Sequence, residues 1–258
     1  MAGNRRRGVV LQDRDRRLLT ELGRMRIIDR EMTKVVAGFG SKTQVSLRLL
    51  ELTRAGLLRR FFVGTIGSGR KAVYTLSAKG GDIVSAQLGG INRPDGKLVT
   101  GDRFVEHQTT INEIYLAVKF KPLPAGVRLV RWHIFRQSIS EAIKITPDAY
   151  FEIATSDATR AVFLEVDLGT EALKVWQEKT AYYLQLAVSG EFTQKFRQPQ
   201  FRVLVVANSD RRLANIRATV AKSTDKIFWF ATLDTIHRDG IWSPIWLRPK
   251  GDQRHSLL

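Results

Sequence analysis

The sequence predicts an α/β protein of the α+β type, built from two parts that differ in the order of helices and strands. In the first part, helical periodicity over residues 11–56 gives way to two short apolar runs around a glycine-rich turn. In the second part, one helical segment precedes three strand-like runs, a further helix and another strand. This order predicts a mixed sheet with helices packed on it. The chain has 258 residues, 43% of them hydrophobic, which is enough for two small packed domains.

The formal net charge of +17 favours a polyanionic partner, either nucleic acid or an anionic membrane surface. No basic amphipathic helix with a bulky apolar face dominates the sequence, and no apolar run approaches the length of a membrane span. We therefore expect DNA as the ligand and no membrane partner. We also expect a cytoplasmic location, because the basic start lacks the apolar core of a secretory signal. The absence of cysteine excludes disulfides and thiolate metal sites.

Three helices are expected in the first part. Asp13 is the expected cap of the first helix, which Gly23 ends. Ile27-Ile28-Asp29 is expected to open a short second helix. A third helix is expected to begin after the cap residue Ser41 and to end at Gly56.

Two strands are expected next, at residues 57–63 and 72–76, joined by a basic, glycine-rich tip at residues 64–71. Three helices followed by a basic hairpin are the layout of a winged helix–turn–helix domain, which we place at residues 10–82. In that layout the third helix enters the major groove, and the hairpin meets the DNA backbone or the minor groove. The residues expected to contact DNA are Lys42, Thr43, Gln44 and Arg48 on the helix and Arg59, Arg60, Arg70 and Lys71 on the hairpin.

Two of these side chains, Gln44 and Arg48, carry the hydrogen-bonding groups that read base edges, whereas Lys42 suits phosphates. A winged helix used only for protein contacts is the alternative. Basic residues on both the third helix and the hairpin favour DNA.

Residues 83–101 are rich in Gly, Asn, Pro and Asp and are predicted to link the first domain to a second one at residues 102–250. In the second domain, adjacent strands are expected at residues 143–153 and 161–167, joined by a polar hairpin loop. Antiparallel pairing would bring Asp148 beside Glu165, and alternation would place Glu165 and Asp167 on one face. Three converging carboxylates suit Mg²⁺ or Mn²⁺. The alternative is that Glu165 and Asp167 are ordinary solvated strand residues.

This arrangement resembles the PD-(D/E)xK nuclease core, in which Pro-Asp on one strand and (Asp/Glu)-x-Lys on the next hold one or two metal ions. Pro147-Asp148 matches the first half of the motif. Glu165-Val166-Asp167 matches the second half except at the lysine, which is an aspartate here. The resemblance implies an αβββαβ core with a mixed sheet.

The next predicted helix carries Lys179 and Tyr183, four residues apart on one helical face. Some members of the nuclease superfamily carry a Gln-x-x-x-Tyr pair there, and Lys179 would replace the missing lysine of the motif. A helix before the first strand contributes an acid in some members, which makes Glu113 a further candidate ligand, with a surface glutamate as the alternative. The resemblance therefore implies catalytic residues Asp148, Glu165, Asp167 and Lys179, and metal ligands Asp148, Glu165, Asp167 and Glu113.

The whole chain, from about Leu11 to about Phe230, resembles the replication-relaxation family of bacterial mobile elements. The resemblance is carried by a winged helix before a basic domain, by Glu165-x-Asp-x-Gly-Thr-Glu171 and by the downstream Lys179 and Tyr183. It implies a DNA ligand and a role in replication and DNA relaxation of a plasmid or another mobile element. Replication or relaxosome proteins are expected as partners, and a homodimer is one alternative for the oligomeric state.

Two functions remain open at this point. One is a metal-dependent endonuclease or nickase. The other is a non-catalytic DNA-binding protein with a degenerate nuclease core, acting as an initiator, a relaxosome accessory factor or a transcription regulator. The missing lysine of the motif favours the second.

Overall fold

The computed structural model describes residues 9–64, 69–85 and 101–258. Most of the predicted linker and residues 65–68 of the predicted hairpin tip lie outside these ranges. The chain divides into two compact units, Met1–Leu116 and Ala117–Leu258, and the boundary falls within helix α5 (Asp102–Lys119). Among the described helices, none has the length and apolar character needed to cross a bilayer.

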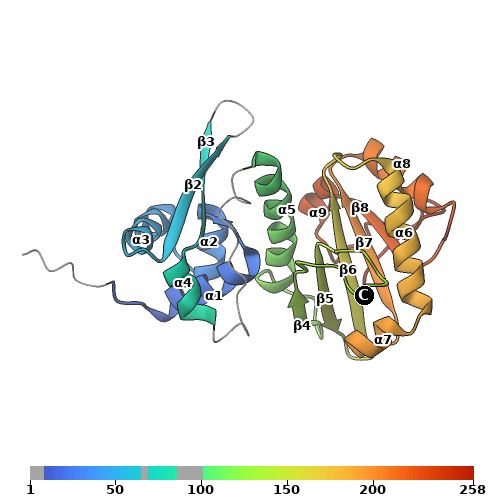
Figure 1. Ribbon diagram of the computed structural model, residues 1–258, viewed down its shortest axis with the longest axis horizontal. Coiled ribbons are helices and arrows are strands. Elements are labelled where there is room, and N and C mark those ends of the chain that lie inside the picture. Colours follow the sequence, from blue (N-terminus) through green and yellow to red (C-terminus); the bar gives the residue numbers. More distant parts are fainter. Residues whose placement is uncertain (1–8, 65–68, 86–100) are drawn as a thin grey trace, which may run out of the picture. The chain divides into compact units, whose positions relative to one another are not determined.

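The first unit contains the predicted three helices and the hairpin, together with a two-residue strand that the sequence did not indicate (Figure 1). This strand, β1, precedes the second helix and pairs with β3, so the sheet has the order β1-β3-β2 and is antiparallel throughout. Ile28 and Asp29, expected inside the second helix, are therefore extended. The elements are α1 (Asp13–Met25), β1 (Ile28–Asp29), α2 (Arg30–Ala37), α3 (Lys42–Arg54), β2 (Leu58–Gly64), β3 (Arg70–Leu76) and α4 (Ala78–Ser85).

The caps of these helices match the sequence at α3 but not at α1. The Ser41 hydroxyl accepts a hydrogen bond from the Gln44 amide at 3.2 Å and caps α3, as expected. At α1 the cap is Gln12, whose amide donates to the Asp15 carboxylate at 2.7 Å, and Asp13 lies in the first turn. Gly23 does not end α1, because the apolar face continues to the buried Met25.

The second unit is organised around a seven-stranded mixed sheet of order β10-β9-β8-β7-β6-β5-β4. The strands β4, β5 and β6 form an antiparallel meander, β6, β7 and β8 are parallel, and β9 and β10 return antiparallel. The strands are β4 (Arg128–His133), β5 (Ala149–Ala154), β6 (Thr159–Asp167), β7 (Phe201–Ala207), β8 (Phe228–Thr232), β9 (Trp246–Leu247) and β10 (Arg254–His255), and the helices are α6 (Leu173–Val188), α7 (Glu191–Phe196), α8 (Asp210–Val220) and α9 (Leu233–Asp239).

The predicted succession of three strands, a helix and another strand is present in this unit, but β5 begins later than expected. Residues 143–148, predicted as a strand, form an irregular segment instead. Its carbonyl groups form local hydrogen bonds: that of Ile143 accepts from the Ser140 backbone amide, and that of Ile145 accepts from the Ile139 backbone amide. Pro147 has no amide proton to offer a neighbouring strand.

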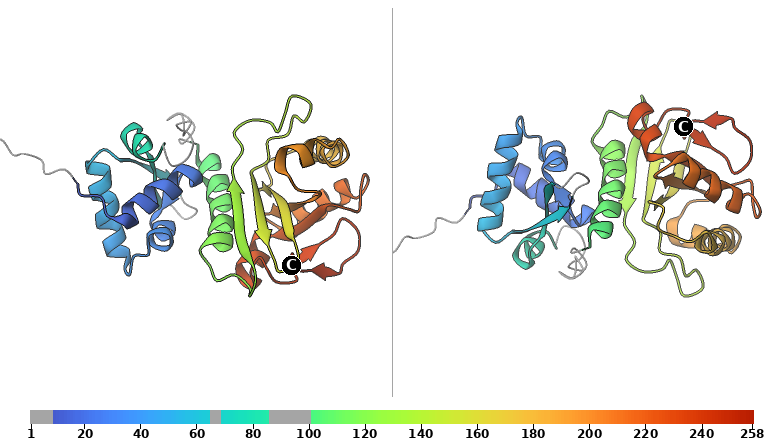
Figure 2. Two further views of the ribbon diagram at one scale, coloured as in Figure 1. Left: turned by 90° about the horizontal axis from the view of Figure 1, so that it is seen from below. Right: turned by 90° about the horizontal axis from the view of Figure 1, so that it is seen from above.

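One face of the sheet is covered by α6 and α8, which lie side by side (Figure 1, Figure 2). Phe163 of β6 points into this layer and packs its ring against Tyr183 of α6 at a centroid distance of 5.5 Å. Because side chains alternate along a strand, Glu165 and Asp167 share this face with Phe163. The packing thus directs two acidic side chains toward α6.

In the first unit the backbone of α4 at Gly80 lies close to the backbone at Leu57. A Cβ atom at Gly80 would lie 2.1 Å from the carbonyl oxygen of Leu57, whereas a Cβ at the adjacent Gly81 would meet nothing within 4 Å. Only a glycine therefore fits at position 80.

We predict that Gly80→Ala lowers the free energy of unfolding by about 2 kcal/mol, because the backbone of β2 or α4 must shift. Gly81→Ala is the matched control in the same helix, and it should raise stability by up to about 1 kcal/mol through helix propensity. Urea denaturation of both variants measures the difference. Equal stabilities would contradict the contact.

Candidate functional site

The end of β6 and the start of β5 bring Asp148 and Glu165 together. Ala149 pairs with Leu164 across the two antiparallel strands, so the next position along each strand places Asp148 opposite Glu165. The Val166 amide donates to Oδ2 of Asp148 at 2.7 Å and fixes this carboxylate at the strand end. The two acids therefore meet as the strand pairing predicts.

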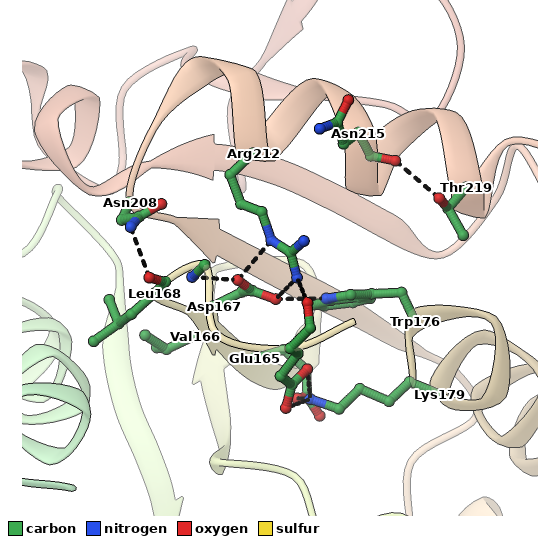
Figure 3. Close-up of polar contacts among 12 residues, drawn as sticks. Glu165, Val166, Asp167, Leu168, Trp176, Lys179, Asn208, Arg212, Asn215 and Thr219 are labelled. Atoms are coloured by element: carbon green, nitrogen blue, oxygen red, sulfur yellow. Dashed lines mark hydrogen bonds and ion pairs between the residues drawn. The ribbon is translucent and has the colours of Figure 1, made fainter. Parts of the chain in front are cut away.

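Glu165 is buried, with a relative exposure of 1%, and both of its oxygens accept hydrogen bonds from α6. Oε2 accepts from Nζ of Lys179 at 2.9 Å (Figure 3). Oε1 accepts from the Tyr183 hydroxyl at 2.6 Å. The pKa of Glu165 is raised to about 7, chiefly by burial; the nearby Asp148 carboxylate also raises it, while Lys179 works against the increase. The two donors from α6 thus stabilise only part of the charge.

Lys179 is shared between two carboxylates. Besides Glu165, its ammonium lies 2.9 Å from Oε2 of Glu171, in the loop before α6. Burial lowers the pKa of Lys179, but attraction to Glu165 and Glu171 outweighs it, so the pKa lies above its ordinary value. Lys179 and Tyr183 lie four residues apart on one face of α6, as predicted, and both therefore reach Glu165.

Asp167 is held in a separate set of bonds (Figure 3). The guanidinium of Arg212, on α8, donates to Oδ1 at 2.8 Å and to Oδ2 at 2.7 Å. The Gly169 amide also donates to Oδ1 and the Trp176 indole to Oδ2, at 2.7 and 2.6 Å. Burial works to raise the pKa of Asp167, but the bonds from Arg212, Trp176 and Gly169 together hold it below its ordinary value.

The expected cage of three carboxylates is therefore not formed. Asp167 points to the same face as Glu165, as predicted, but its oxygens are committed to Arg212, Trp176 and Gly169. Glu113 belongs to the first unit, whereas Asp148 and Glu165 belong to the second. Among the residues that the structure describes, no group of three or more His, Asp or Glu is placed to hold a metal ion. What remains is a pair of carboxylates with one lysine.

In the first unit, the residues expected to contact DNA are exposed with one exception. Lys42, Thr43 and Gln44 are exposed in the first turn of α3, and the Lys42 ammonium lies 3.0 Å from Glu31. The hairpin residues Arg59, Arg60, Arg70 and Lys71 are also exposed. Lys71 binds the Asp29 carboxylate at 2.5 Å, and the guanidinium groups of Arg59 and Arg60 lie over the rings of Phe61 and Phe62, each at 5.1 Å.

The exception is Arg48, whose side chain turns toward α1. Its guanidinium donates to both oxygens of the fully buried Asp15, at 2.9 and 2.5 Å, and to Glu51 at 2.6 Å. These bonds, first of all those to Asp15, raise the pKa of Arg48 above its ordinary value. A guanidinium held in this way stabilises the packing of α1 on α3, so the expected reading of bases by Arg48 has no support in the structure.

We predict that Arg212→Met lowers the free energy of unfolding by about 3 kcal/mol at neutral pH, because it leaves the Asp167 carboxylate buried without its cation. The bound arginine lowers the pKa of Asp167, so the pair stabilises the fold above the ordinary aspartate pKa, and this contribution is lost as pH falls. The deficit of the variant should therefore shrink in acid. Denaturant titrations at several pH values measure it.

The control for this variant is Arg211→Met, one residue earlier on α8 and exposed, which should leave stability within about 0.5 kcal/mol of the original. A similar loss in both variants would mean that the contribution of Arg212 comes from the helix and not from Asp167.

Comparison with known protein families identifies the family of this chain. Residues 14–198, well over half of its length, match the model of a family described as replication-relaxation. No curated protein and no solved structure matches the chain. The match begins in α1 and ends just after α7, so it includes the basic hairpin and the acidic strand ends. This chain belongs to the replication-relaxation family.

Proposed function

We propose that this protein binds duplex DNA through its first unit, as a winged helix, and acts in the replication or relaxation of DNA of a plasmid or another mobile element. The observation that carries the proposal is the set of exposed basic residues on α3 and on the β2–β3 hairpin. Family membership supports a role in replication and relaxation.

Two of these basic residues, Arg70 and Lys71, line a hollow beside α3 that Asp29 and Glu31 also line. Ser46 of α3 and the hairpin residues Phe62, Arg70 and Lys71 line one hollow of about 480 Å³. A short strand before α2 forms a three-stranded sheet with the hairpin, and this supports the proposal of a winged helix. In such a domain the exposed first turn of α3 would enter the major groove.

The charges on the hairpin are available to phosphates. Within the described part of the chain, neither Arg59 nor Arg60 has a carboxylate within ion-pair distance, whereas Lys42 and Lys71 are each paired with an acid. Unpaired guanidinium groups on a surface release counterions when they bind the DNA backbone. We therefore expect Arg59, Arg60 and Arg70 to supply affinity, and Gln44 to contact base edges.

The Arg59→Ala, Arg60→Ala double variant should bind a short DNA duplex about tenfold or more weakly, and its plot of log affinity against log salt should be shallower by about 1 to 2 units. Fluorescence anisotropy over a range of salt concentrations measures both quantities. The matched control is Lys222→Ala, Lys226→Ala, which removes two exposed charges from the second unit. Unchanged affinity and slope in the hairpin variant would overturn the proposed interface.

A second candidate function, metal-dependent cleavage of DNA, is supported by the cluster of Asp148, Glu165 and Lys179. Lys179 pairs with both Glu165 and Glu171, and the pKa of Glu165 is raised first by burial and also by the negative charge of the neighbouring Asp148. Mg²⁺ is often bound by one or two carboxylates and completes its shell with water. Asp148 and Glu165 fit such a site for Mg²⁺ or Mn²⁺, and Asp167 does not.

In this proposal the metal, when bound, would supply Lewis acidity and an activated water. Lys179 holds Glu165 in place from α6 and offers a positive charge to a phosphate, and Tyr183 fixes the second oxygen of Glu165. The same two bonds also give the non-catalytic alternative its support, because they occupy both Glu165 oxygens. In that alternative the core is degenerate and the protein is an initiator, an accessory factor or a regulator.

We predict that Mn²⁺ binding, measured by calorimetry, strengthens as pH rises through about 7, because the proton on Glu165 competes with the cation. Asp148→Asn should weaken it about tenfold or more and should abolish Mg²⁺-dependent nicking of supercoiled plasmid. Asp157→Asn, at an exposed loop position, is the control. Absence of metal binding in the unmodified protein would leave the non-catalytic DNA-binding function.

A further inference from the structure

A cluster of three arginines lies on the face of the second sheet that is opposite the acidic residues. Val162 of β6 pairs with Arg202 of β7, and Leu204 of β7 pairs with Trp229 of β8. Because side chains alternate along each strand, Arg160, Arg202 and Trp229 share one face, and Glu165 lies on the other. The third arginine, Arg248, follows β9 directly.

Two of the arginines stack on the same indole. The guanidinium carbon of Arg202 lies 4.4 Å from the ring centroid of Trp229, and that of Arg248 lies 4.7 Å from it. Trp229 is 8% exposed, so two cations contact a buried ring. Cation–π attraction offsets part of the repulsion between these two cations.

In the described part of the chain no carboxylate forms an ion pair with Arg202 or Arg248, although the charge of the exposed Asp225 acts on Arg248. Among the described residues, Arg202 makes one hydrogen bond, to the carbonyl of Leu257 at 2.5 Å, and Arg248 makes one, to the carbonyl of Asp225 at 3.2 Å. Arg160 approaches only the exposed Asp157, at 3.9 Å. The nitrogens Nε of Arg160 and Nε1 of Trp229 are buried without any hydrogen-bond partner.

These donors are unusual because a buried polar group without a hydrogen-bond partner destabilises the folded state. The pKa of Arg202 is lowered to about 10, first by burial and then by the positive charges of Arg160 and Arg248. A guanidinium has five donors in a planar fork, so most donors of this cluster have no acceptor among the residues that the structure describes.

We propose that Arg160, Arg202 and Arg248, together with the Trp229 indole N–H, form a binding site for a phosphate group. A phosphate provides several acceptor oxygens and at least one negative charge, and arginine forks bind it with short, charge-assisted hydrogen bonds. It would relieve the repulsion among the three cations and supply acceptors for the unpaired donors. This site is separate from the acidic cluster, and it does not depend on the proposed interface of the first unit.

The test is a titration of the full chain with inorganic phosphate and pyrophosphate, followed by the indole and arginine Nε–H signals in ¹H–¹⁵N spectra. Trp229→Phe assigns the indole signal. The Trp229 and Arg160 signals should shift saturably at constant ionic strength, and Arg202→Gln should weaken the affinity about tenfold or more. Arg211→Gln, at an exposed position on α8, is the control.

A second variant keeps the test decisive if Arg202→Gln fails to fold. Arg160→Gln removes a charge whose sole ion-pair partner among the described residues is the exposed Asp157, so the fold should tolerate it. This variant should also weaken phosphate binding. The proposal is overturned if no shift occurs, if sodium chloride alone produces the same shift, or if Arg160→Gln binds phosphate as tightly as the unmodified protein.

The same spectra distinguish the sources of the phosphate. A short DNA duplex is added to the Arg59→Ala, Arg60→Ala protein, in which the first unit is weakened. A shift of the Trp229 signal that Arg160→Gln removes assigns the site to the phosphodiester backbone. A shift with pyrophosphate but not with DNA assigns it to a free phosphate compound. Failure of the hairpin variant to lose DNA affinity would count against the proposed function and leave this result unchanged.

Discussion

The buried carboxylate of Asp167 is the constraint on which the second unit depends. A charged group in a protein interior is tolerated only with partners for its charge and for its lone pairs. Asp167 receives these from three elements: Arg212 on α8, Trp176 on α6 and the Gly169 amide in the loop after β6. The requirement therefore ties the end of β6 to both helices that cover this face of the sheet. Glu165, two residues earlier, is bound by Lys179 and Tyr183 further along α6.

The first unit also contains a buried aspartate that is paired with an arginine. Asp15 is fully buried in α1, and Arg48 of α3 reaches it with two nitrogens. In each unit an arginine from one helix neutralises a buried acid on another element. In this way a chain with a formal net charge of +17 keeps internal ion pairs while many of its basic side chains are exposed.

Much of the fold could be predicted from the sequence because periodicity and turn residues act locally. The three helices, the hairpin and the strand–helix–strand order of the second unit follow from such patterns, and so does the meeting of Asp148 with Glu165 across a short hairpin. The partners of Asp167 and Arg48 could not be predicted in this way. Arg212 is 45 residues from Asp167 and Arg48 is 33 from Asp15, so neither pairing leaves a local signal. The arginines around Trp229 are scattered along the chain for the same reason.

The position of β6 in the sheet has a consequence for how the second unit folds. Its antiparallel neighbour β5 is adjacent in the chain, but its parallel neighbour β7 comes after two helices, α6 and α7. During synthesis the meander β4–β5–β6 can form early, and it then carries an unpaired apolar edge until Ala207 has left the ribosome. The slowest and most aggregation-prone stage of folding is therefore the closure of the parallel pair, and any chaperone that assists this protein has that edge to protect.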